Sequence, residues 1–351
     1  MNLKHFLKDI LWLLEFGLKD LKMKIFTILG REKKDIYRLL IKVNNSCNYR
    51  CISCGNWKNS KDTFIPKEKE ELIIKKFEND LFFLSITGGE PFLQEERLFE
   101  FVKKIKKANP KLKYISINTN CSRPKQVHRF VENLLTEFPG LNLHLGLHYI
   151  PSEKWGLRET RIEEARENYK KTRKVAEKLK KKFGKKIPLC GKGFTFYNII
   201  TIHRKEDFDF IRKEKDLWLG FAIANEQFYN NKEENSIEEI INKDKIKIID
   251  DFIKINKSEM SFLNKRCTKN MRKILKKKER KRKCYAGINR KYVNPKGEIF
   301  ACSRGVKERK DMNSEKCSGC WTSCESNFDL VADFFIPSIF NRHKRDVKIE
   351  R

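Results

Sequence analysis

The 351-residue sequence contains no apolar run that is long enough to span a lipid bilayer. It also shows no secretory signal, because charged residues interrupt every apolar run in residues 1–30: Lys4, Lys8, Asp9, Glu15, Lys19 and Asp20. Without such a signal, the 11 cysteines are poor candidates for a disulfide framework, and their clustering indicates metal binding in a reducing compartment. We therefore expect a soluble, cytoplasmic protein.

Acidic residues are in the minority, with 47 Asp and Glu against 78 Lys and Arg and a formal net charge of +31. Such an excess is typical of proteins that bind nucleic acid, an anionic membrane surface or an acidic substrate. Lysine is spread over almost every predicted helix, however, as a lysine-rich genome or a hot habitat would also produce. Nucleic-acid binding is therefore permitted but not favoured. With 39% hydrophobic residues the chain can still bury a sizeable core.

A fourth cysteine is missing from the stretch Cys47-Asn48-Tyr49-Arg50-Cys51-Ile52-Ser53-Cys54. Its C-x3-C-x2-C spacing follows an apolar run, Tyr37–Val43, that predicts a β-strand. Structural zinc sites and ordinary iron–sulfur sites take four protein ligands. Three thiols would instead leave one iron of a cluster open to another ligand. Half of a zinc site, or a chance grouping, is the alternative.

A second motif, Gly88-Gly89-Glu90-Pro91, follows the apolar run Leu81–Thr87, which also predicts a strand. Two glycines let the backbone approach a ligand closely, and Glu90 adds a negative charge at the turn. Pro91 suits the first turn of a helix. Alone, the motif is an ordinary strand-to-helix turn, but its position behind the three cysteines makes the pair of motifs specific.

Together these motifs resemble the radical S-adenosylmethionine (SAM) superfamily, whose signature is CxxxCxxC followed by a GGEP-type motif at the end of the second strand. The resemblance implies a [4Fe–4S] cluster on Cys47, Cys51 and Cys54, with SAM chelating the fourth iron. Gly88, Gly89 and Glu90 would then hold the SAM amino group. In that superfamily the reduced cluster passes an electron to SAM, and a 5′-deoxyadenosyl radical abstracts hydrogen from a substrate.

Strand-like and helix-like segments alternate six times over roughly 180 residues, which predicts a parallel sheet with right-handed crossover helices. After Tyr37–Val43, the predicted strands are Leu81–Thr87, Lys113–Asn118, Asn142–His148, Gly193–Ile200 and Leu217–Ala224. The predicted helices are Pro66–Asn79, Leu93–Ala108, Arg123–Leu135, Arg161–Phe183 and Lys205–Arg212. The expected α/β fold is a partial (β/α)6 TIM-like barrel, which agrees with the resemblance, followed by a small cysteine-rich α+β extension.

Further candidate residues lie where the predicted strands end, because parallel α/β barrels gather reactive groups there. Asn118 and Asn120 end the third strand, where the resemblance implies polar contacts to SAM. His148 ends the fourth strand, where relatives often carry a serine and an acidic residue, so this chain departs from the pattern. His148 either contacts SAM or the substrate, or is a partly exposed histidine at a strand end.

Three other positions complete the expected SAM site. Arg158 and Arg161 fall where relatives keep an arginine near the SAM carboxylate, a task that suits a bidentate guanidinium. Ser53 precedes the third cysteine, where only a backbone contact to adenine is implied. Cys121 and Cys190 have no spacing partner, and we expect them to be buried as small apolar groups.

A second cysteine group flanks and follows a predicted hairpin, with strands at Lys291–Asn294 and Glu298–Cys302 joined by Pro295-Lys296-Gly297. Its members are Cys284, Cys302, Cys317, Cys320 and Cys324. The segment resembles the SPASM and twitch extensions of radical SAM enzymes, which implies an auxiliary [4Fe–4S] cluster. Four of the five cysteines would serve as its ligands, and the spacing leaves open which one is spare. A structural zinc site is the alternative.

The expected segments are an amphipathic helix (1–33), the barrel (34–230), a helical basic linker (231–283), the auxiliary-cluster domain (284–330) and a tail (331–351). Apolar residues share one face of the first helix, and we expect this face to pack against the main domain. Its Trp12, Phe16 and flanking lysines also fit peripheral contact with a membrane, which stays an alternative.

The predicted function is that of a radical SAM oxidoreductase or maturase acting on an unidentified substrate. Relatives with this layout modify peptides or proteins, build cofactors, or act in carbohydrate and lipid biosynthesis, and the basic surface permits a peptide or anionic substrate. No redox-carrier domain is recognisable in the chain, so we expect an external ferredoxin or flavodoxin. The competing interpretation is a zinc-binding, non-enzymatic nucleic-acid-binding protein, which leaves the GGEP motif and the barrel rhythm unexplained.

Overall fold

The computed structural model describes residues 36–52, 54–59, 64–184, 193–202, 219–223, 286–303 and 307–308, with isolated helical positions at 14, 18, 246, 250, 269, 272, 273 and 276. The chain divides into two compact units. One unit consists of Ile36–Lys243 and Tyr292–Ile299, and the other of Met1–Asp35, Asp244–Lys291 and Phe300–Arg351. The first unit contains the sheet and helices that position the candidate site.

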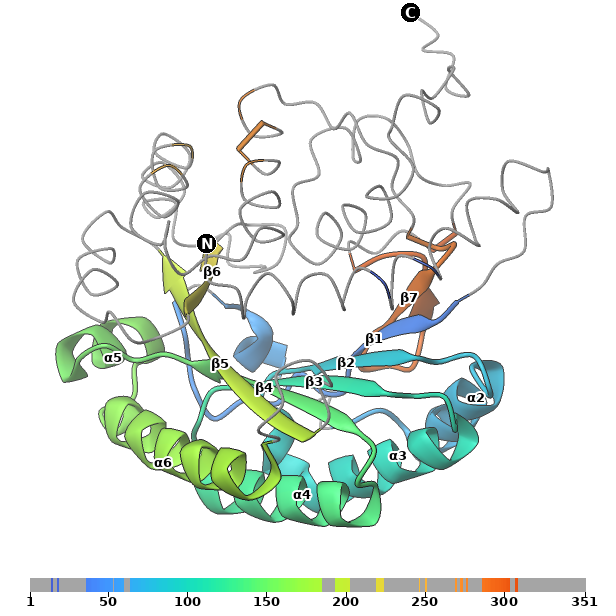
Figure 1. Ribbon diagram of the computed structural model, residues 1–351. Helices are drawn as coiled ribbons and strands as arrows, with labels where there is room; N and C mark the ends of the chain where they lie inside the picture. Colours follow the sequence, from blue (N-terminus) through green and yellow to red (C-terminus); the bar gives the residue numbers. More distant parts are fainter. Residues whose placement is uncertain are drawn as a thin grey trace, which may run out of the picture. The chain divides into compact units, whose positions relative to one another are not determined.

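Six strands form a parallel sheet in the order of the sequence (Figure 1). They are β1 (Arg38–Lys42), β2 (Phe83–Thr87), β3 (Tyr114–Thr119), β4 (Asn142–His148), β5 (Gly193–Ile202) and β6 (Leu219–Ile223). The sheet order continues past β1 to β7 (Arg290–Val293) and β8 (Ile299–Phe300). These strands confirm the predicted α/β fold with a parallel sheet, and their order is the one that a partial barrel requires.

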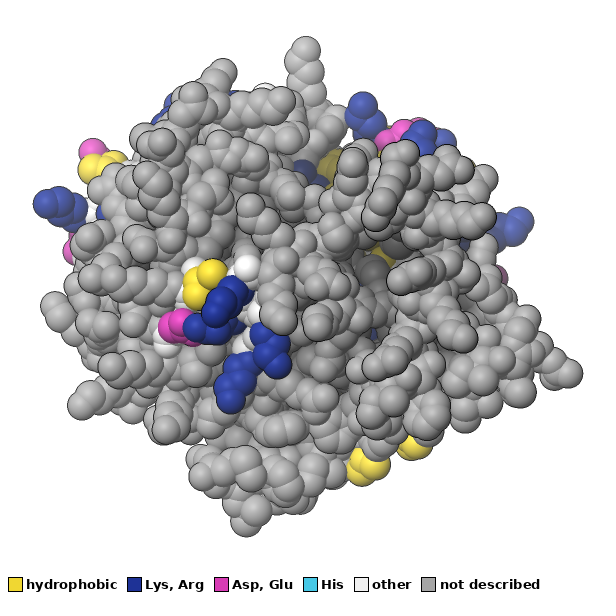
Figure 2. Space-filling view, turned by 90° about the horizontal axis from the view of Figure 1, so that it is seen from above, with side chains coloured by type: hydrophobic (Ala, Val, Ile, Leu, Met, Phe, Trp, Pro, Cys, Tyr) yellow, Lys and Arg dark blue, Asp and Glu magenta, His cyan; other side chains and the backbone are white. Residues whose placement is uncertain are grey.

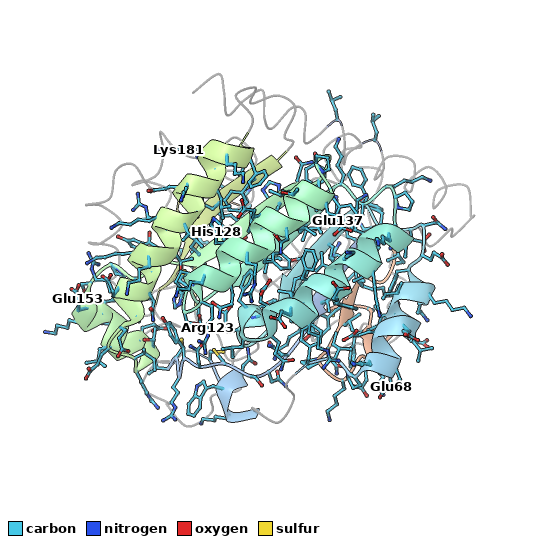
Figure 3. The ribbon with its side chains drawn as sticks, turned by 90° about the horizontal axis from the view of Figure 1, so that it is seen from below. Glu68, Arg123, His128, Glu137, Glu153 and Lys181 are labelled. Carbon is cyan, nitrogen blue, oxygen red and sulfur yellow. The ribbon has the colours of Figure 1, made fainter. Side chains whose placement is uncertain are left out.

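Helices cover one face of this sheet, and α4 (Pro124–Glu137) lies between α3 (Glu95–Ala108) and α6 (Ala165–Phe183) when seen from below (Figure 3). The helices are α2 (Lys67–Lys76), α3 (Glu95–Ala108), α4 (Pro124–Glu137), α5 (Glu153–Thr160) and α6 (Ala165–Phe183), with 3-10 turns η1 (Asn56–Asn59) and η2 (Pro91–Gln94). The buried residues of α4 show why it packs: Val127, Phe130, Val131, Leu134 and Leu135 recur at helical spacing.

The two faces of the sheet differ in chemistry. Residues that face the helices are fully buried and aliphatic, such as Ile86, Ile117 and Leu145. Their neighbours along each strand point the other way and are largely polar and at least partly exposed, such as Ser116 and Asn118. A parallel sheet that is buried on both faces has nearly continuous apolar strands, so this alternation marks the second face as polar and at least partly accessible.

The bounds of β4 agree with the predicted strand Asn142–His148, but α5 was not predicted. Helix α6 begins at Ala165 instead of Arg161, because Arg161 ends α5 in a left-handed conformation (φ 57°). Gly156 in the middle of α5 lowers its helix propensity, yet a Cβ there would lie 2.7 Å from the Ile150 side chain. The predicted helix Lys205–Arg212 lies outside the described residues.

The predicted N-terminal helix is described only at Leu14 and Leu18, which are both helical and exposed. Among the residues that the structure describes, no helix is both long and apolar enough to cross a membrane. Lysine and arginine are prominent among the described side chains in the view from above (Figure 2), as the net charge of +31 leads one to expect.

Candidate functional site

The loop after β1 presents three thiols, Cys47, Cys51 and Cys54, which are half-buried and not in disulfide bonds. A bond from the Cys54 amide to the Cys51 carbonyl (3.1 Å) closes the turn between the last two. Burial raises the pKa of the Cys47 thiol to about 12, and the charge of Glu90 adds to the rise. Burial also raises the pKa values of Cys51 and Cys54. These thiols therefore need a cationic centre, such as iron, to be held as thiolates.

The end of α5 holds this loop in place. The Arg50 amide donates to the Thr160 carbonyl (3.0 Å), and the Ile52 amide donates to the Glu159 carbonyl (2.9 Å). Both Glu159 and Thr160 are completely buried. The last carbonyls of a helix have no partner within the helix, and here the cysteine loop supplies it. Sequence patterns could not indicate this contact, because α5 itself was missed.

The donor set fits an iron–sulfur cluster. Cys47 Sγ accepts from the Tyr49 amide (3.4 Å) and from Asn120 Nδ2 (3.5 Å), and N–H donors to sulfur are one way that proteins tune cluster potentials. Within the described ranges, no group of three or more His, Cys, Asp and Glu side chains could hold a single metal ion. Three thiols on one short loop suit three separate irons, with a fourth iron left open.

The Gly88–Gly89–Glu90 turn is joined to the start of the cysteine loop. The Gly89 amide donates to both the backbone oxygen and Oδ1 of Asn44 (2.9 Å each), and the Glu90 amide donates to the Ser46 carbonyl (2.8 Å). A Cβ at Gly88 would lie 2.2 Å from Asn44 Oδ1, and one at Gly89 would lie 2.1 Å from the Ser46 carbonyl. The glycines are therefore needed for contact between the two motifs, whereas the sequence suggested only close approach to a ligand.

Glu90 is completely buried and links this turn to the end of β3. Its carboxylate accepts from the Phe92 amide (3.1 Å), the Thr119 hydroxyl (2.9 Å) and the Asn120 amide (2.6 Å). Burial raises the pKa of Glu90 to about 7, although these hydrogen bonds and Arg123 oppose the rise. The carboxylate thus orders the end of β3, and a direct contact between Glu90 and the SAM amino group stays a prediction.

Asn120 brings the third element into the site. Its Nδ2 reaches Asn48 Oδ1 (3.0 Å) as well as Cys47, and its Oδ1 accepts from the Ser122 amide (2.9 Å). Asn118, two residues earlier on β3, is exposed and accepts a hydrogen bond at Oδ1 from Tyr197 Oη on β5 (3.1 Å). No sequence pattern indicates Tyr197, because only the strand register brings it near Asn118.

His148 and Arg158 lie around a third residue, Trp155. The His148 ring meets the Trp155 ring edge to face, with centroids 6.0 Å apart, and the Arg158 guanidinium lies 6.0 Å from the same ring. Both residues therefore contact Trp155 of α5, the helix that supports the cysteine loop. Their contacts to SAM stay predictions. Cys121 is completely buried, as predicted.

Several predicted positions lie outside the described residues: Ser53, Cys190, Cys284, Cys317, Cys320 and Cys324. Of the second cysteine group, Cys302 is described and is buried. The predicted hairpin is present in β7 and β8, where the Asn294 amide donates to the Glu298 carbonyl (3.1 Å) and Gly297 adopts a positive φ of 76°. The auxiliary cluster itself stays a prediction.

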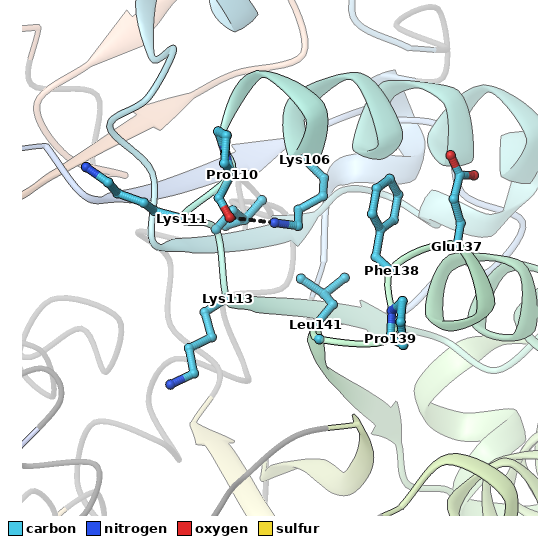
Figure 4. Close-up of a pocket in the computed structure, with 10 residues that line it drawn as sticks. Lys106, Pro110, Lys111, Lys113, Glu137, Phe138, Pro139 and Leu141 are labelled. Atoms are coloured by element: carbon cyan, nitrogen blue, oxygen red, sulfur yellow. Dashed lines mark hydrogen bonds between the residues drawn. The ribbon is translucent and has the colours of Figure 1, made fainter.

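A cavity of about 390 Å³ lies at the other end of the strands, between the end of α3 and the end of α4. Lys106 Nζ donates to the Pro110 carbonyl there, at 2.8 Å (Figure 4). The cavity adjoins Lys113 and Leu141, which directly precede β3 and β4. Since parallel α/β barrels form their active sites at the C-terminal ends of strands, we do not assign this cavity to the functional site.

Comparison with known proteins agrees with this geometry. Residues 41–211, just under half of the chain, match the family model of the radical SAM superfamily. Proteins of this superfamily use a [4Fe–4S] cluster and SAM, which is the cofactor pair predicted from the two motifs. The competing interpretation as a non-enzymatic zinc protein is not favoured.

Three curated relatives are similar to part of the chain. A Methanocaldococcus jannaschii protein named as a glycyl-radical enzyme activating enzyme is 26% identical over 160 residues, 44% of this chain and 57% of that protein. A Thermococcus kodakarensis protein named as a GTP 3′,8-cyclase is 30% identical over 114 residues, 32% of this chain and 36% of that protein. A Fibrobacter SAM-dependent nucleotide dehydratase is 35% identical over 98 residues, 25% of this chain and 28% of that protein.

The chain thus spans little more than half the length of the first relative and about a third of the other two. Among solved structures, SuiB of Streptococcus suis bound to SAM is 15% identical, with a TM-score of 0.45 over 77% of this chain and 61% of that one. SuiB bound to its precursor peptide SuiA gives a TM-score of 0.43 at 15% identity, over 91% of this chain and 69% of that one.

Proposed function

We propose that this protein is a radical SAM enzyme that binds a [4Fe–4S] cluster through Cys47, Cys51 and Cys54. The observation that carries the proposal is the joining of the thiol loop to the Gly88–Gly89–Glu90 turn and to Asn120. When bound and reduced, the cluster supplies the electron that cleaves SAM and yields the 5′-deoxyadenosyl radical. The reaction class is hydrogen abstraction from a substrate held in the barrel.

The chain's own residues hold and shield this site. The end of α5 fixes the backbone of the thiol loop through Arg50 and Ile52, while Asn120 donates to the Cys47 sulfur. Glu90 holds the end of β3 beside the loop from a completely buried position. Preorganisation of this kind keeps a reactive ligand in one orientation and limits the access of water.

For the substrate we propose an anionic molecule, such as a nucleotide or an acidic peptide. The net charge of +31 favours such a molecule, and two of the relatives are named for nucleotides. The name of the first relative refers to activation of another enzyme, so modification of a protein is the second candidate.

Electrons would come from an external acidic carrier of the ferredoxin or flavodoxin class. Trp57 Nε1 donates to the Cys51 carbonyl (3.3 Å), and the exposed Lys58 places its ammonium 5.6 Å from the Trp57 ring. A positive charge so close to the thiol loop would attract an acidic carrier. Lys58→Glu should therefore raise the carrier concentration needed for half-maximal rate, while turnover with dithionite is unchanged. An equal requirement for the carrier in both proteins would contradict this role of Lys58.

Two further assignments remain proposals. An auxiliary [4Fe–4S] cluster would take four ligands from Cys284, Cys302, Cys317, Cys320 and Cys324. The N-terminal helix would either pack on the main domain or contact a membrane peripherally. Liposome flotation of the full chain and of a variant lacking residues 2–29 tests the membrane contact, which unchanged flotation would exclude.

The proposed function is tested by the products of SAM cleavage. Anaerobically reconstituted protein, given SAM and dithionite, should release 5′-deoxyadenosine and methionine. The Cys47/Cys51/Cys54→Ala variant should release neither, because it lacks the cluster ligands. A Cys121→Ala variant is the matched control, since Cys121 is a buried cysteine outside the loop. Equal product from the triple variant and the wild type would contradict the proposal.

A further inference from the structure

The face of the sheet that points away from the helices forms a polar surface, which we call the inner wall. It consists of Ser85 and Thr87 on β2, Ser116 and Asn118 on β3, His144 and Gly146 on β4, and Thr195 and Tyr197 on β5. The strand register places Ser116 beside His144 and His144 beside Thr195. These side chains are mostly neutral hydrogen-bonding groups, so the wall suits a polar ligand.

Within the inner wall, Tyr197 and Asn118 meet across the intervening strand. Gly146 is paired in register with Asn118 on one side and with Tyr197 on the other. Tyr197 Oη donates to Asn118 Oδ1 at 3.1 Å, above the glycine. A Cβ at Gly146 would lie 2.2 Å from Asn118 Oδ1 and 3.0 Å from Tyr197 Oη. The glycine thus leaves the space in which this hydrogen bond forms.

This pair lies near Asn120, the residue that contacts the thiol loop. Asn118 precedes Asn120 by two residues along the chain, which corresponds to about 7 Å along an extended strand. Asn120 Nδ2 itself lies 3.5 Å from Cys47 Sγ. A ligand that binds a cluster on this loop and extends along the inner wall therefore reaches Asn118. SAM is larger than this distance and carries several oxygen and nitrogen acceptors.

We propose that Tyr197 is a positioning residue for SAM, acting through Asn118. An asparagine amide has an acceptor end and a donor end, and the Tyr197 hydroxyl occupies the acceptor end. The donor end, Nδ2, is thereby directed to an acceptor atom of SAM. Without the hydroxyl, the exposed Asn118 side chain can rotate and present either end. This inference rests on the proposed function, because it requires that the protein binds SAM.

The test compares SAM affinities of reconstituted variants by anaerobic titration calorimetry. Tyr197→Phe should raise the SAM dissociation constant about three- to tenfold, the size expected from one lost hydrogen bond. Asn118→Ala should weaken binding at least as much. In the Asn118→Ala background, Tyr197→Phe should have no further effect, because a residue that acts through Asn118 has nothing left to position. Gly146→Ala should reproduce the loss by filling the space between the two side chains.

The matched control is Tyr169→Phe, which also removes a tyrosine hydroxyl bonded to an asparagine, Asn198 Oδ1 at 3.0 Å, but between α6 and the sheet and outside the inner wall. Its SAM affinity should equal that of the wild type. Tyr197→Phe with unchanged affinity, or with an equal effect in both backgrounds, would overturn the inference while leaving the proposed function intact. Wild-type protein that holds its cluster but does not bind SAM would overturn the proposed function and this inference with it.

Discussion

The two ends of the strands are built in different ways. At the C-terminal end, contacts join the loops that follow different strands to one another and to α5: Asn44 bonds to the Gly89 turn, Glu90 to Asn120, and the thiol loop to the end of α5. At the N-terminal end, Asn109 bonds to Ile105 in its own helix and to the Leu81 amide before β2. The difference indicates that one end is organised around a site, and the other end only joins helices to strands.

The largest effect is expected from a methyl group added at the C-terminal end of the strands, where the loops are bonded to one another. Gly89→Ala should remove bound iron and lower the free energy of unfolding by more than about 3 kcal/mol, because its Cβ would lie 2.1 Å from the Ser46 carbonyl. Gly140→Ala at the other end is the control, since a Cβ there meets nothing within 4 Å. Urea titration and iron analysis measure both. Equal unfolding free energies and equal iron contents in the two variants would contradict the proposed difference between the two ends of the strands.

Glu90 should make the free energy of unfolding depend on pH. Burial raises its pKa from an ordinary value of 4.5 to about 7 in the folded protein. Between pH 4.5 and 7 the folded state keeps a proton on Glu90 that the unfolded chain has released. Protonation of Glu90 therefore stabilises the folded state fully below pH 4.5, and this contribution is lost as the pH rises through 7. The slope is at most about 1.4 kcal/mol per pH unit.

Glu90→Gln removes the titrating group and should flatten the dependence of unfolding free energy on pH in that interval. The variant should also be less stable at low pH by about 1 kcal/mol, because an NH2 group replaces one of the two carboxyl oxygens that accept hydrogen bonds. Urea titrations of the apoprotein from pH 4.5 to 7 measure both effects. A slope that is the same in Glu90→Gln and the wild type would assign the pH dependence to other groups.

Two asparagine variants distinguish an effect on protein stability from an effect on the cluster. Asn120→Ala and Asn109→Ala each remove a largely buried side chain that forms hydrogen bonds, so each should cost about 1–3 kcal/mol of unfolding free energy. The Asn120 variant alone should change the cluster, because it removes a donor to the Cys47 sulfur. Redox titration should show a shifted potential for this variant and the wild-type potential for Asn109→Ala. Equal potentials in all three proteins would argue against the role of Asn120.

The smallest effect is expected at the N-terminal end. Lys106→Met removes the exposed hydrogen bond to the Pro110 carbonyl and should change the unfolding free energy by less than about 1 kcal/mol. Release of 5′-deoxyadenosine should not change. A large loss of product in this variant would mean that the cavity beside Lys106 contributes to the site after all.

The sequence was sufficient where local pattern decides structure. Alternating leucines gave the bounds of β4, and cysteine spacing together with the Gly-Gly turn identified the two motifs that the structure joins. The spacing could not show why both glycines are needed, because their neighbours Asn44 and Ser46 lie more than 40 residues earlier in the chain.

Features that depend on tertiary contacts were missed. Helix α5 has only 8 residues and an internal glycine, so its helix propensity is low. Its role is structural, because the carbonyls at its end accept hydrogen bonds from the backbone of the thiol loop. Tyr197 looks like any strand tyrosine until the register of β4 and β5 places it across Gly146 from Asn118. Neither feature has a signal within a short window of sequence.

The most direct test of the account is to count iron and sulfide in wild-type protein and in the Cys47/Cys51/Cys54→Ala variant, and to record the electron paramagnetic resonance spectrum of each after reduction. We expect the variant to lose about four irons and four sulfides per chain. We also expect SAM to change the spectrum of the wild type, because it binds the open iron. Equal iron content in the two proteins, or a wild-type spectrum that SAM leaves unchanged, would contradict the claim that this loop holds a cluster with one open position.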